Sequence, residues 1–232
     1  MNTIINDVAA IGIVPVIKIN DPKDAVPLAR ALYDGGLPAA EVTFRTACAK
    51  EAIALISKAL PDMLVGAGTV LTPQQADDAV AAGAKFIVSP GLNPNVVRHC
   101  ISRDIPIVPG CATPGDIEQA LEFGLDVVKF FPAEQAGGIA MIKAMSAPYT
   151  NVKFMPTGGI NPKNLVEYLS FSKVLACGGS WMVKEDLINE GRFDEITRLA
   201  KEAVMIMLGF ELAHVGINPE AGEDSDAIAG SF

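Results

Sequence analysis

A single unit repeats along this chain. It consists of a short apolar segment, a polar turn and an amphipathic helix, and it occurs eight times from Ile11 onward. Short apolar segments without polar alternation are typical of parallel strands that are buried on both faces. The predicted strands begin near Ile13, Ala39, Met63, Lys85, Pro106, Leu125, Val152 and Val174.

Five of the predicted helices open with a favoured capping residue followed by proline. Proline suits the first helical position because the N–H that it lacks has no partner there. The pairs lie one or two repeat units apart, so they mark the same period along the chain. They are Asp21-Pro22, Thr72-Pro73, Asn93-Pro94, Thr113-Pro114 and Asn161-Pro162.

Eight consecutive units predict one α/β domain, a closed (β/α)8 TIM barrel over residues 1–209, with its site at the C-terminal ends of the strands. An open doubly wound sheet is the alternative, but Gly66-Ala67-Gly68 lacks the third glycine of the dinucleotide fingerprint. We expect a short helix in Met1–Ala10 to close the bottom of the barrel and a last long helix over Phe193–Leu208.

Residues 210–232 are predicted to form a C-terminal extension. Glu211–Asn218 alternates partly like a strand, and Pro219–Phe232 is acidic and rich in small residues, as flexible tails are.

Charge and composition exclude several classes of function. The net charge of −9 argues against a nucleic-acid partner, because phosphate backbones select basic surfaces. Two histidines and four scattered cysteines favour reduced thiols over disulfides or zinc, so we expect no metal and no cofactor. No apolar stretch is long enough for a membrane span, and Met1–Ala10 has no basic residue of a secretory signal. We therefore expect a cytoplasmic protein without a membrane partner.

One predicted strand contains a lysine. Leu125–Pro132 consists mainly of apolar and aromatic residues, and such a strand is buried. Lys129 is therefore predicted to lie inside the protein. Burial strips water from an ammonium group and favours the neutral amine, which is the nucleophile in Schiff-base enzymes. The alternative is a structural lysine that pairs with a buried carboxylate or reaches to the strand end.

The second predicted strand places three polar residues on one face. Glu41, Thr43 and Arg45 follow the period of two that puts alternate side chains on the same side. If this face lines the barrel mouth, Glu41 can shuttle protons near Lys129 and Arg45 can hold a carboxylate. A buried Glu41–Arg45 ion pair that only fixes the strand is the alternative.

Four other predicted strands end in small polar residues and glycines. Glycine allows backbone amides to approach a ligand closely, and the last two loops of such barrels commonly bind phosphate. The sequence therefore predicts a phosphate site there. The four segments are Gly66–Thr69, Ser89–Gly91, Pro156–Gly159 and Cys177–Ser180.

Together these motifs resemble the 2-dehydro-3-deoxy-6-phosphogluconate (KDPG) aldolase / 4-hydroxy-2-oxoglutarate aldolase family. The similarity covers about Ile4 to Leu208, with the motifs in the same order. They are Glu41-Val-Thr-Phe-Arg45, Val65-Gly-Ala-Gly-Thr69, Ser89-Pro-Gly91, Lys129-Phe-Phe-Pro-Ala133, Pro156-Thr-Gly-Gly159 and Gly178-Gly-Ser-Trp181.

The resemblance implies a homotrimeric, metal-free class I aldolase of the Entner-Doudoroff type. Such enzymes cleave KDPG to pyruvate and glyceraldehyde 3-phosphate, and often 4-hydroxy-2-oxoglutarate to pyruvate and glyoxylate. It also implies residue roles. The Schiff-base lysine is Lys129 and the general acid/base is Glu41. The pyruvate pocket contains Arg45, Thr69 and Pro90, and the phosphate loops contain Gly158, Gly159, Gly179 and Ser180. Thr157 contacts the substrate, as does Lys18, which lies where some members have an arginine.

Three alternatives stay open at this point. A 6-phosphogalactonate aldolase would differ only in the stereochemistry at C4. A phosphate-binding barrel isomerase or epimerase would use Glu41 as a carbon base and form no covalent adduct with pyruvate. A non-catalytic barrel would bind a metabolite or serve as a structural trimer. The extension departs from the family pattern, since Glu211–Asn218 resembles the first strand of a glyoxalase-type fold that some relatives carry.

Overall fold

The computed structural model describes residues 3–209, and in them strands and helices alternate along the chain. The strands are β1 (Ile13–Ile17), β2 (Ala39–Thr43), β3 (Leu64–Gly68), β4 (Phe86–Val88), β5 (Ile107–Val108), β6 (Val127–Phe130), β7 (Lys153–Pro156) and β8 (Cys177–Gly179). The helices are α1 (Thr3–Ile11), the 3₁₀ helix η1 (Pro22–Asp24), α2 (Ala25–Asp34), α3 (Ala49–Ala59), α4 (Pro73–Ala81), α5 (Pro94–Ser102), α6 (Pro114–Glu122), α7 (Gly138–Ser146), α8 (Leu165–Leu169), α9 (Glu185–Asn189) and α10 (Phe193–Met207).

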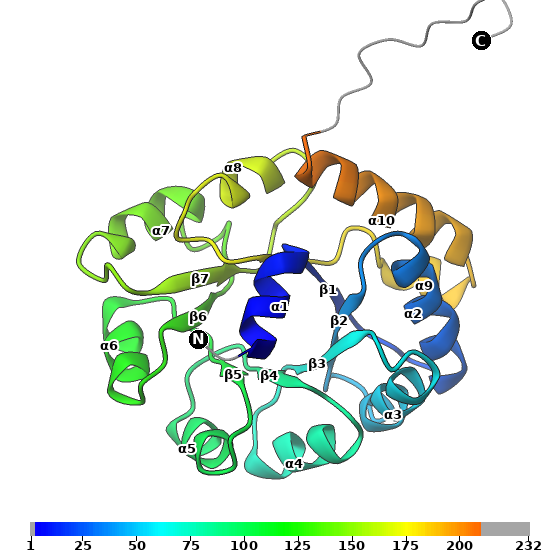
Figure 1. The fold of residues 1–232 in the computed structure, drawn as a ribbon, viewed down its shortest axis with the longest axis horizontal. Coiled ribbons are helices and arrows are strands. Elements are labelled where there is room, and N and C mark those ends of the chain that lie inside the picture. Colours follow the sequence, from blue (N-terminus) through cyan, green and yellow to red (C-terminus); the bar gives the residue numbers. More distant parts are fainter. Residues whose placement is uncertain (1–2, 210–232) are drawn as a thin grey trace, which may run out of the picture.

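The strands lie in the centre of the molecule, and helices α2 to α10 surround them (Figure 1). Every strand pairing is parallel. One sheet has the order β5-β4-β3-β2-β1-β8 and a second sheet pairs β6 with β7. Single parallel bridges join the two sheets, from Gly110 to Lys129 on one side and from Thr157 to Gly178 on the other. The predicted α/β class with parallel strands is confirmed.

Local capping explains where three helices begin. The side chains of Thr72, Asn93 and Thr113 accept hydrogen bonds from backbone N–H groups in the first turns of α4, α5 and α6, each with proline at the helix start. Asp116 completes a reciprocal capping box at Thr113. Asp21 also caps as expected, although the helix that it opens is the short η1.

The prediction that Asn161 begins a helix is wrong by one turn. The Asn161 side chain accepts from the Lys163 backbone N–H at 2.9 Å, while the Asn164 side chain accepts from the Asn161 N–H at 2.8 Å. Asparagine commonly closes turns in this way. α8 therefore begins only at Leu165.

Two strands begin later than predicted. Leu125 donates its N–H to the Ala120 carbonyl and so belongs to the turn that closes α6, and β6 begins at Val127. Val174 forms only a single bridge, to Phe154, and β8 begins at Cys177. The other six predicted strands begin at the predicted residue or one residue after it.

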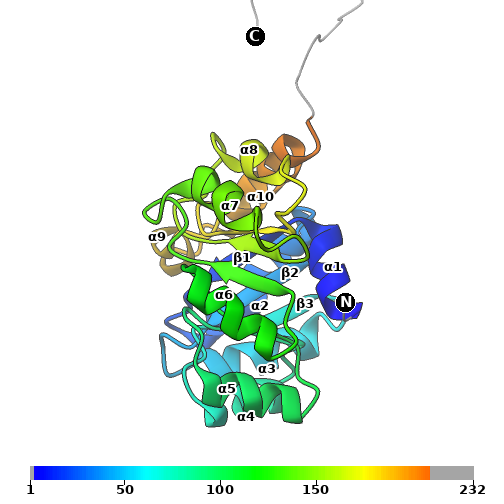
Figure 2. The same ribbon diagram turned by 90° about the vertical axis from the view of Figure 1, so that its left-hand side faces the viewer.

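Helix α1 lies across the ends of the strands, as expected for an N-terminal helix that closes the bottom (Figures 1 and 2). Its buried residues Ile5 and Val8 share one apolar cluster with Phe86, Met155 and Ala176 from the strand region. The last long helix also agrees with its prediction, because α10 begins at Phe193 and ends at Met207. The predicted extension at 210–232 lies outside the described residues.

The four cysteines are free, and three of them are buried. Burial raises the pKa of Cys100 to about 11 and the pKa values of Cys111 and Cys177 to about 12, so these thiols stay protonated at neutral pH. The expected burial of most of these thiols is confirmed. Between residues 3 and 209, no helix combines the length and the apolar character that crossing a membrane requires.

Candidate active site

A cavity of about 290 Å³ lies at the C-terminal ends of the strands. Most of its lining comes from the last residues of strands or from the loops that follow them, where the repeat predicts the site. All the predicted site residues except Lys18 contribute to the lining. The lining residues are Val16, Glu41, Thr43, Arg45, Thr69, Pro90, Lys129, Phe131, Thr157, Gly158, Gly159, Ile160, Gly178, Gly179 and Ser180.

Lys129 and Glu41 meet in the floor of this cavity. Their side chains are 6% and 0% exposed, and Lys129 Nζ lies 3.2 Å from Glu41 Oε1. Parallel pairing of β1 and β3 on either side of β2 holds Glu41 in the middle of its strand. The expected meeting of lysine and carboxylate is therefore present, and Glu41 forms its ion pair with Lys129 rather than with Arg45.

The surroundings of this pair leave room for a reaction. Glu41 Oε2 is buried without a hydrogen-bond partner, so one carboxylate oxygen is free toward a ligand. A Cβ at Gly68 would lie 2.1 Å from Glu41 Oε1, and only glycine leaves space for this carboxylate. Lys129 Nζ also lies 5.3 Å from the centroid of the Phe131 ring, within range of a cation–π contact.

Arg45 lies in the turn after β2, two residues beyond the end of the strand, and the last residue of that strand orients it. Its Nε donates to Thr43 Oγ1 at 3.1 Å, and the Thr43 hydroxyl donates to the Ile17 carbonyl at 2.7 Å. The terminal guanidinium nitrogens have no hydrogen-bond or ion-pair partner within residues 3–209. A carboxylate ligand can therefore bind at this free edge.

Thr69 and Pro90 line the cavity from the loops after β3 and β4. Thr69 has φ 54°, a left-handed conformation that is uncommon for a β-branched residue. Such strained positions cluster at functional sites. Next to Pro90, the Ser89 hydroxyl donates to the Gly91 carbonyl at 2.8 Å and closes a compact turn.

Thr157, the residue after β7, pairs with Gly178 of β8 through a single parallel bridge. Thr157 Oγ1 is buried and has no partner, so it can bind a ligand atom in the cavity. Gly158 and Gly159 have φ values of 99° and 82°, which favour glycine. A Cβ at Gly179 would lie 1.9 Å from the Trp181 ring, so a side chain there would clash.

A buried tyrosine supports this glycine loop from behind. The Tyr168 hydroxyl donates to Glu134 Oε1, and the Glu134 N–H donates to the Gly158 carbonyl. Burial and the nearby Glu134 carboxylate raise the pKa of Tyr168 far above its usual value. The tyrosine therefore stays a donor at any physiological pH and holds the loop segment in place.

Comparison with known families gives one assignment. The model of the KDPG and KHG aldolase family matches residues 4–199. The chain belongs to this family.

Relatives in the family cover most of this chain. A 2-dehydro-3-deoxy-phosphogluconate aldolase from Treponema pallidum is 53% identical over 207 residues, which cover 89% of this chain and 99% of that protein. A KHG/KDPG aldolase from Escherichia coli K12 is 45% identical over 192 residues, covering 83% of this chain and 90% of that protein.

A solved KDPG aldolase from Legionella pneumophila superposes with a TM-score of 0.83 at 44% identity, covering 86% of this chain and 97% of the other. That structure holds pyruvate as a covalent carbinolamine intermediate. A structure described as native KDPGal is less similar to this chain, with 27% identity and a TM-score of 0.70.

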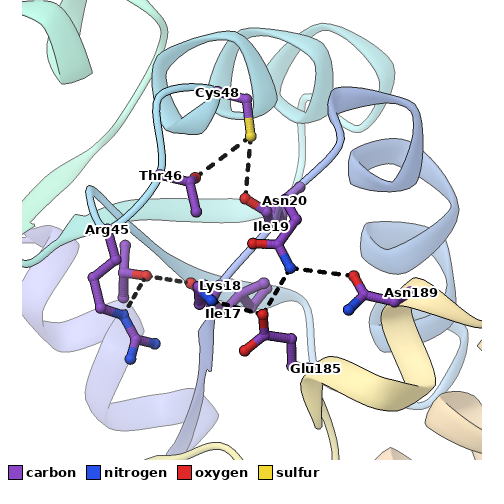
Figure 3. A network of polar contacts seen from close by, with 10 residues as sticks. Ile17, Lys18, Ile19, Asn20, Arg45, Thr46, Cys48, Glu185 and Asn189 are labelled. Carbon is purple, nitrogen blue, oxygen red and sulfur yellow. Dashed lines mark hydrogen bonds and ion pairs between the residues drawn. The ribbon is translucent and has the colours of Figure 1, made fainter.

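In this member of the aldolase family, Lys18 lies outside the cavity lining. Its Nζ pairs with Glu185 Oε1 of α9 at 2.6 Å, and the Asn20 amide donates to the same oxygen at 2.7 Å (Figure 3). These two hydrogen bonds hold the pKa of the Glu185 carboxyl below its usual value, and the charge of nearby Arg45 adds to the effect. Lys18 thus joins the end of β1 to α9.

The described part of the chain contains no group of three or more histidine, cysteine or acidic side chains arranged to hold a metal. His99 lies on α5, where its Nε2 is 2.8 Å from Asp77 Oδ1, as expected for an ordinary helix residue.

Sequence reasoning did not select three further lining residues of this aldolase site, namely Val16, Phe131 and Ile160. Phe131 directly follows the strand that contains Lys129, and this position in the sequence could have indicated that it lines the site. Val16 and Ile160 are apolar residues among many, and no local pattern separates them from the core.

Proposed function

We propose that this chain is a class I aldolase that cleaves KDPG to pyruvate and glyceraldehyde 3-phosphate, and also 4-hydroxy-2-oxoglutarate to pyruvate and glyoxylate. The observation that carries the proposal is the contact between the buried Lys129 amine and the Glu41 carboxylate in the cavity floor. A relative with the same fold holds pyruvate as a carbinolamine, the first covalent product of an amine and this ketone. The isomerase and non-catalytic alternatives have no such support.

The first half of the reaction forms the Schiff base. Glu41 first takes a proton from the Lys129 ammonium, and the neutral Nζ then attacks the C2 ketone. The protonated Glu41 gives this proton to the carbinolamine hydroxyl, which leaves as water. The resulting protonated imine withdraws electrons from the neighbouring C3–C4 bond. Glu41 is suited to this work because Oε1 contacts the amine while Oε2 is free.

The second half breaks the carbon chain. Glu41, directly or through a water molecule, takes the proton of the C4 hydroxyl, the C3–C4 bonding electrons move into the imine, and the aldehyde leaves. The enamine that remains takes a proton at C3, and water then releases pyruvate and regenerates the amine.

The other lining residues bind the substrate in this proposal. Arg45, Thr69 and Pro90 form the pyruvate pocket, and Thr157 Oγ1 contacts the substrate. The phosphate binds to the loops with Gly158, Gly159, Gly179 and Ser180, where close backbone approach is possible. The role of Lys18 as a substrate contact stays a prediction, and its amine is paired with Glu185 in the structure.

The finer fold assignment is part of the proposal. We propose that the eight parallel strands form one closed (β/α)8 barrel. The support is the bridge from Gly110 to Lys129 together with the bridges from Phe154 to Val174 and from Thr157 to Gly178, which lie where β5 would join β6 and β7 would join β8. The division between a barrel over 1–209 and an extension over 210–232 stays a prediction.

Borohydride reduction in the presence of pyruvate tests the central step. We expect a mass increase equal to reduced pyruvate, and peptide mapping should place it on Lys129. Pyruvate without borohydride and borohydride without pyruvate are the controls. If a class I aldolase is trapped under the same conditions and this protein is not, the Schiff-base proposal fails and the isomerase alternative gains support. Release of pyruvate from the two C4 epimers then identifies the natural one.

Assembly and location complete the proposal. From the family resemblance we propose a homotrimer in the cytoplasm. Light scattering during size-exclusion chromatography should give three times the chain mass, and a monomer across the working concentration range would contradict the trimer.

A further inference from the structure

The Thr43 hydroxyl occupies a defined position between two strands. Thr43 is 2% exposed and lies at the end of β2, beside the end of β1. Its single proton goes to the Ile17 carbonyl at 2.7 Å. Because a hydroxyl has only one proton to donate, its oxygen can act toward Arg45 only as an acceptor.

This fixed direction determines how Arg45 is presented. Arg45 Nε donates to Thr43 Oγ1 at 3.1 Å, so the Nε edge of the guanidinium is occupied. The two terminal nitrogens of the planar guanidinium then remain as hydrogen-bond donors that can bind both oxygens of a carboxylate. Those nitrogens have no partner among the described residues, and Arg45 lines the cavity.

A carboxylate outside the cavity lining also attracts Arg45. The Glu185 carboxylate lies beside Lys18 and Asn20 (Figure 3). It is close enough to Arg45 that the arginine charge helps to lower the pKa of Glu185. An unanchored arginine side chain is long and would turn toward this carboxylate. The bond to Thr43 opposes that movement.

We propose that Thr43 is a positioning residue that aims the terminal edge of Arg45 at the substrate carboxylate. This inference rests on the proposed function, since it assigns the carboxylate of a pyruvate-type ketone to Arg45. In this proposal Thr43 acts through Arg45 and not on a reacting atom. Its loss should therefore weaken recognition of the carboxylate and leave the chemistry at the ketone unchanged.

The test compares trapping rates for two ketones. Pyruvate carries a carboxylate, whereas methyl pyruvate carries the same ketone beside an uncharged ester. The readout is the ratio of the two borohydride trapping rates at subsaturating ketone. In Thr43→Val this ratio should fall by about tenfold, the size expected for one hydrogen bond to a charged group. Thr43→Ser keeps the hydroxyl and should retain the wild-type ratio.

A double-variant comparison separates positioning from general damage. If Thr43 acts through Arg45, Thr43→Val should lower the ratio no further in an Arg45→Ala background. An unchanged ratio in Thr43→Val, or an equal fall in both backgrounds, would overturn this proposal. Should Thr43→Val fail to fold, Thr43→Ala takes its place in both backgrounds. Lack of any wild-type adduct on Lys129 would overturn the proposed function as well, whereas a normal wild-type adduct with an unchanged ratio overturns this inference alone.

Discussion

Replacing Lys129 by methionine is expected to abolish aldol cleavage, with kcat/KM falling by roughly 10⁵- to 10⁶-fold, as for removal of the nucleophile in other covalent enzymes. No other amine lines the cavity formed by the described residues. Without the lysine no imine forms, and no electron sink is available for breaking the C3–C4 bond. A coupled assay of pyruvate release measures the rate, and borohydride trapping should give no adduct.

This substitution also removes the cation from a buried pair. Glu41 would be left as a buried carboxylate without its partner, which typically destabilises a protein by about 3–5 kcal/mol. Lys129→Arg keeps the positive charge beside Glu41 but cannot form a Schiff base, and so it is the matched control for folding. If either variant, correctly folded by circular dichroism, retained more than about one hundredth of wild-type activity, Lys129 would lose its assigned role.

Glu41→Gln is expected to lower kcat by roughly 10²- to 10⁴-fold, the usual contribution of a positioned general acid/base. The amide keeps the shape of the carboxylate, which matters because Gly68 leaves room for that shape and little else. It can neither take the C4 hydroxyl proton nor return one to the carbinolamine. KM should change little, since the glutamate works on protons and does not bind the substrate carboxylate or phosphate.

The matched control for this change is Glu118→Gln on α6, where the exposed carboxylate accepts from the Tyr149 hydroxyl far from the cavity. Steady-state kinetics and rapid trapping with pyruvate should show slower adduct formation in Glu41→Gln only. Near-normal turnover of a folded Glu41→Gln variant would show that another group or water moves the protons.

The start of a helix could be predicted wherever one residue decides it. Thr72, Asn93 and Thr113 cap their helices with their own side chains, a local interaction that a sequence displays directly. Asn161 has the same signature, yet the side chain of Asn164 competes for the same backbone and closes a turn first. Two favoured capping residues within one turn leave the helix start undecided.

The strand that the sequence indicated least well is β8. Two of its three residues are Gly178 and Gly179, which show no side-chain pattern, so the apolar residues from Val174 onward seemed to begin the strand. In the structure that earlier segment contacts β7 through one bridge only. Glycines are needed there because the Trp181 ring and Thr157 fill the space that side chains would occupy.

The centre of the site could be predicted because it depends on strand parity. Glu41 and Thr43 alternate along β2, Arg45 follows in the next turn, and Lys129 lies within β6. Parallel pairing of the strands brings these residues to one cavity. Lys18 could not be placed in this way. Its partner Glu185 is 167 residues further along the chain, and such a distant pair leaves no local pattern.

Helix α1 carries a consequence for the order in which the protein acquires its structure. Ile5 and Val8 leave the ribosome well before Met155 and Ala176, which belong to the same apolar cluster. Contacts between such distant segments require the intervening chain to be in place. Helix α1 can thus contact Val14 of β1 early, but its full apolar cluster forms only after the chain up to Ala176 has been synthesised.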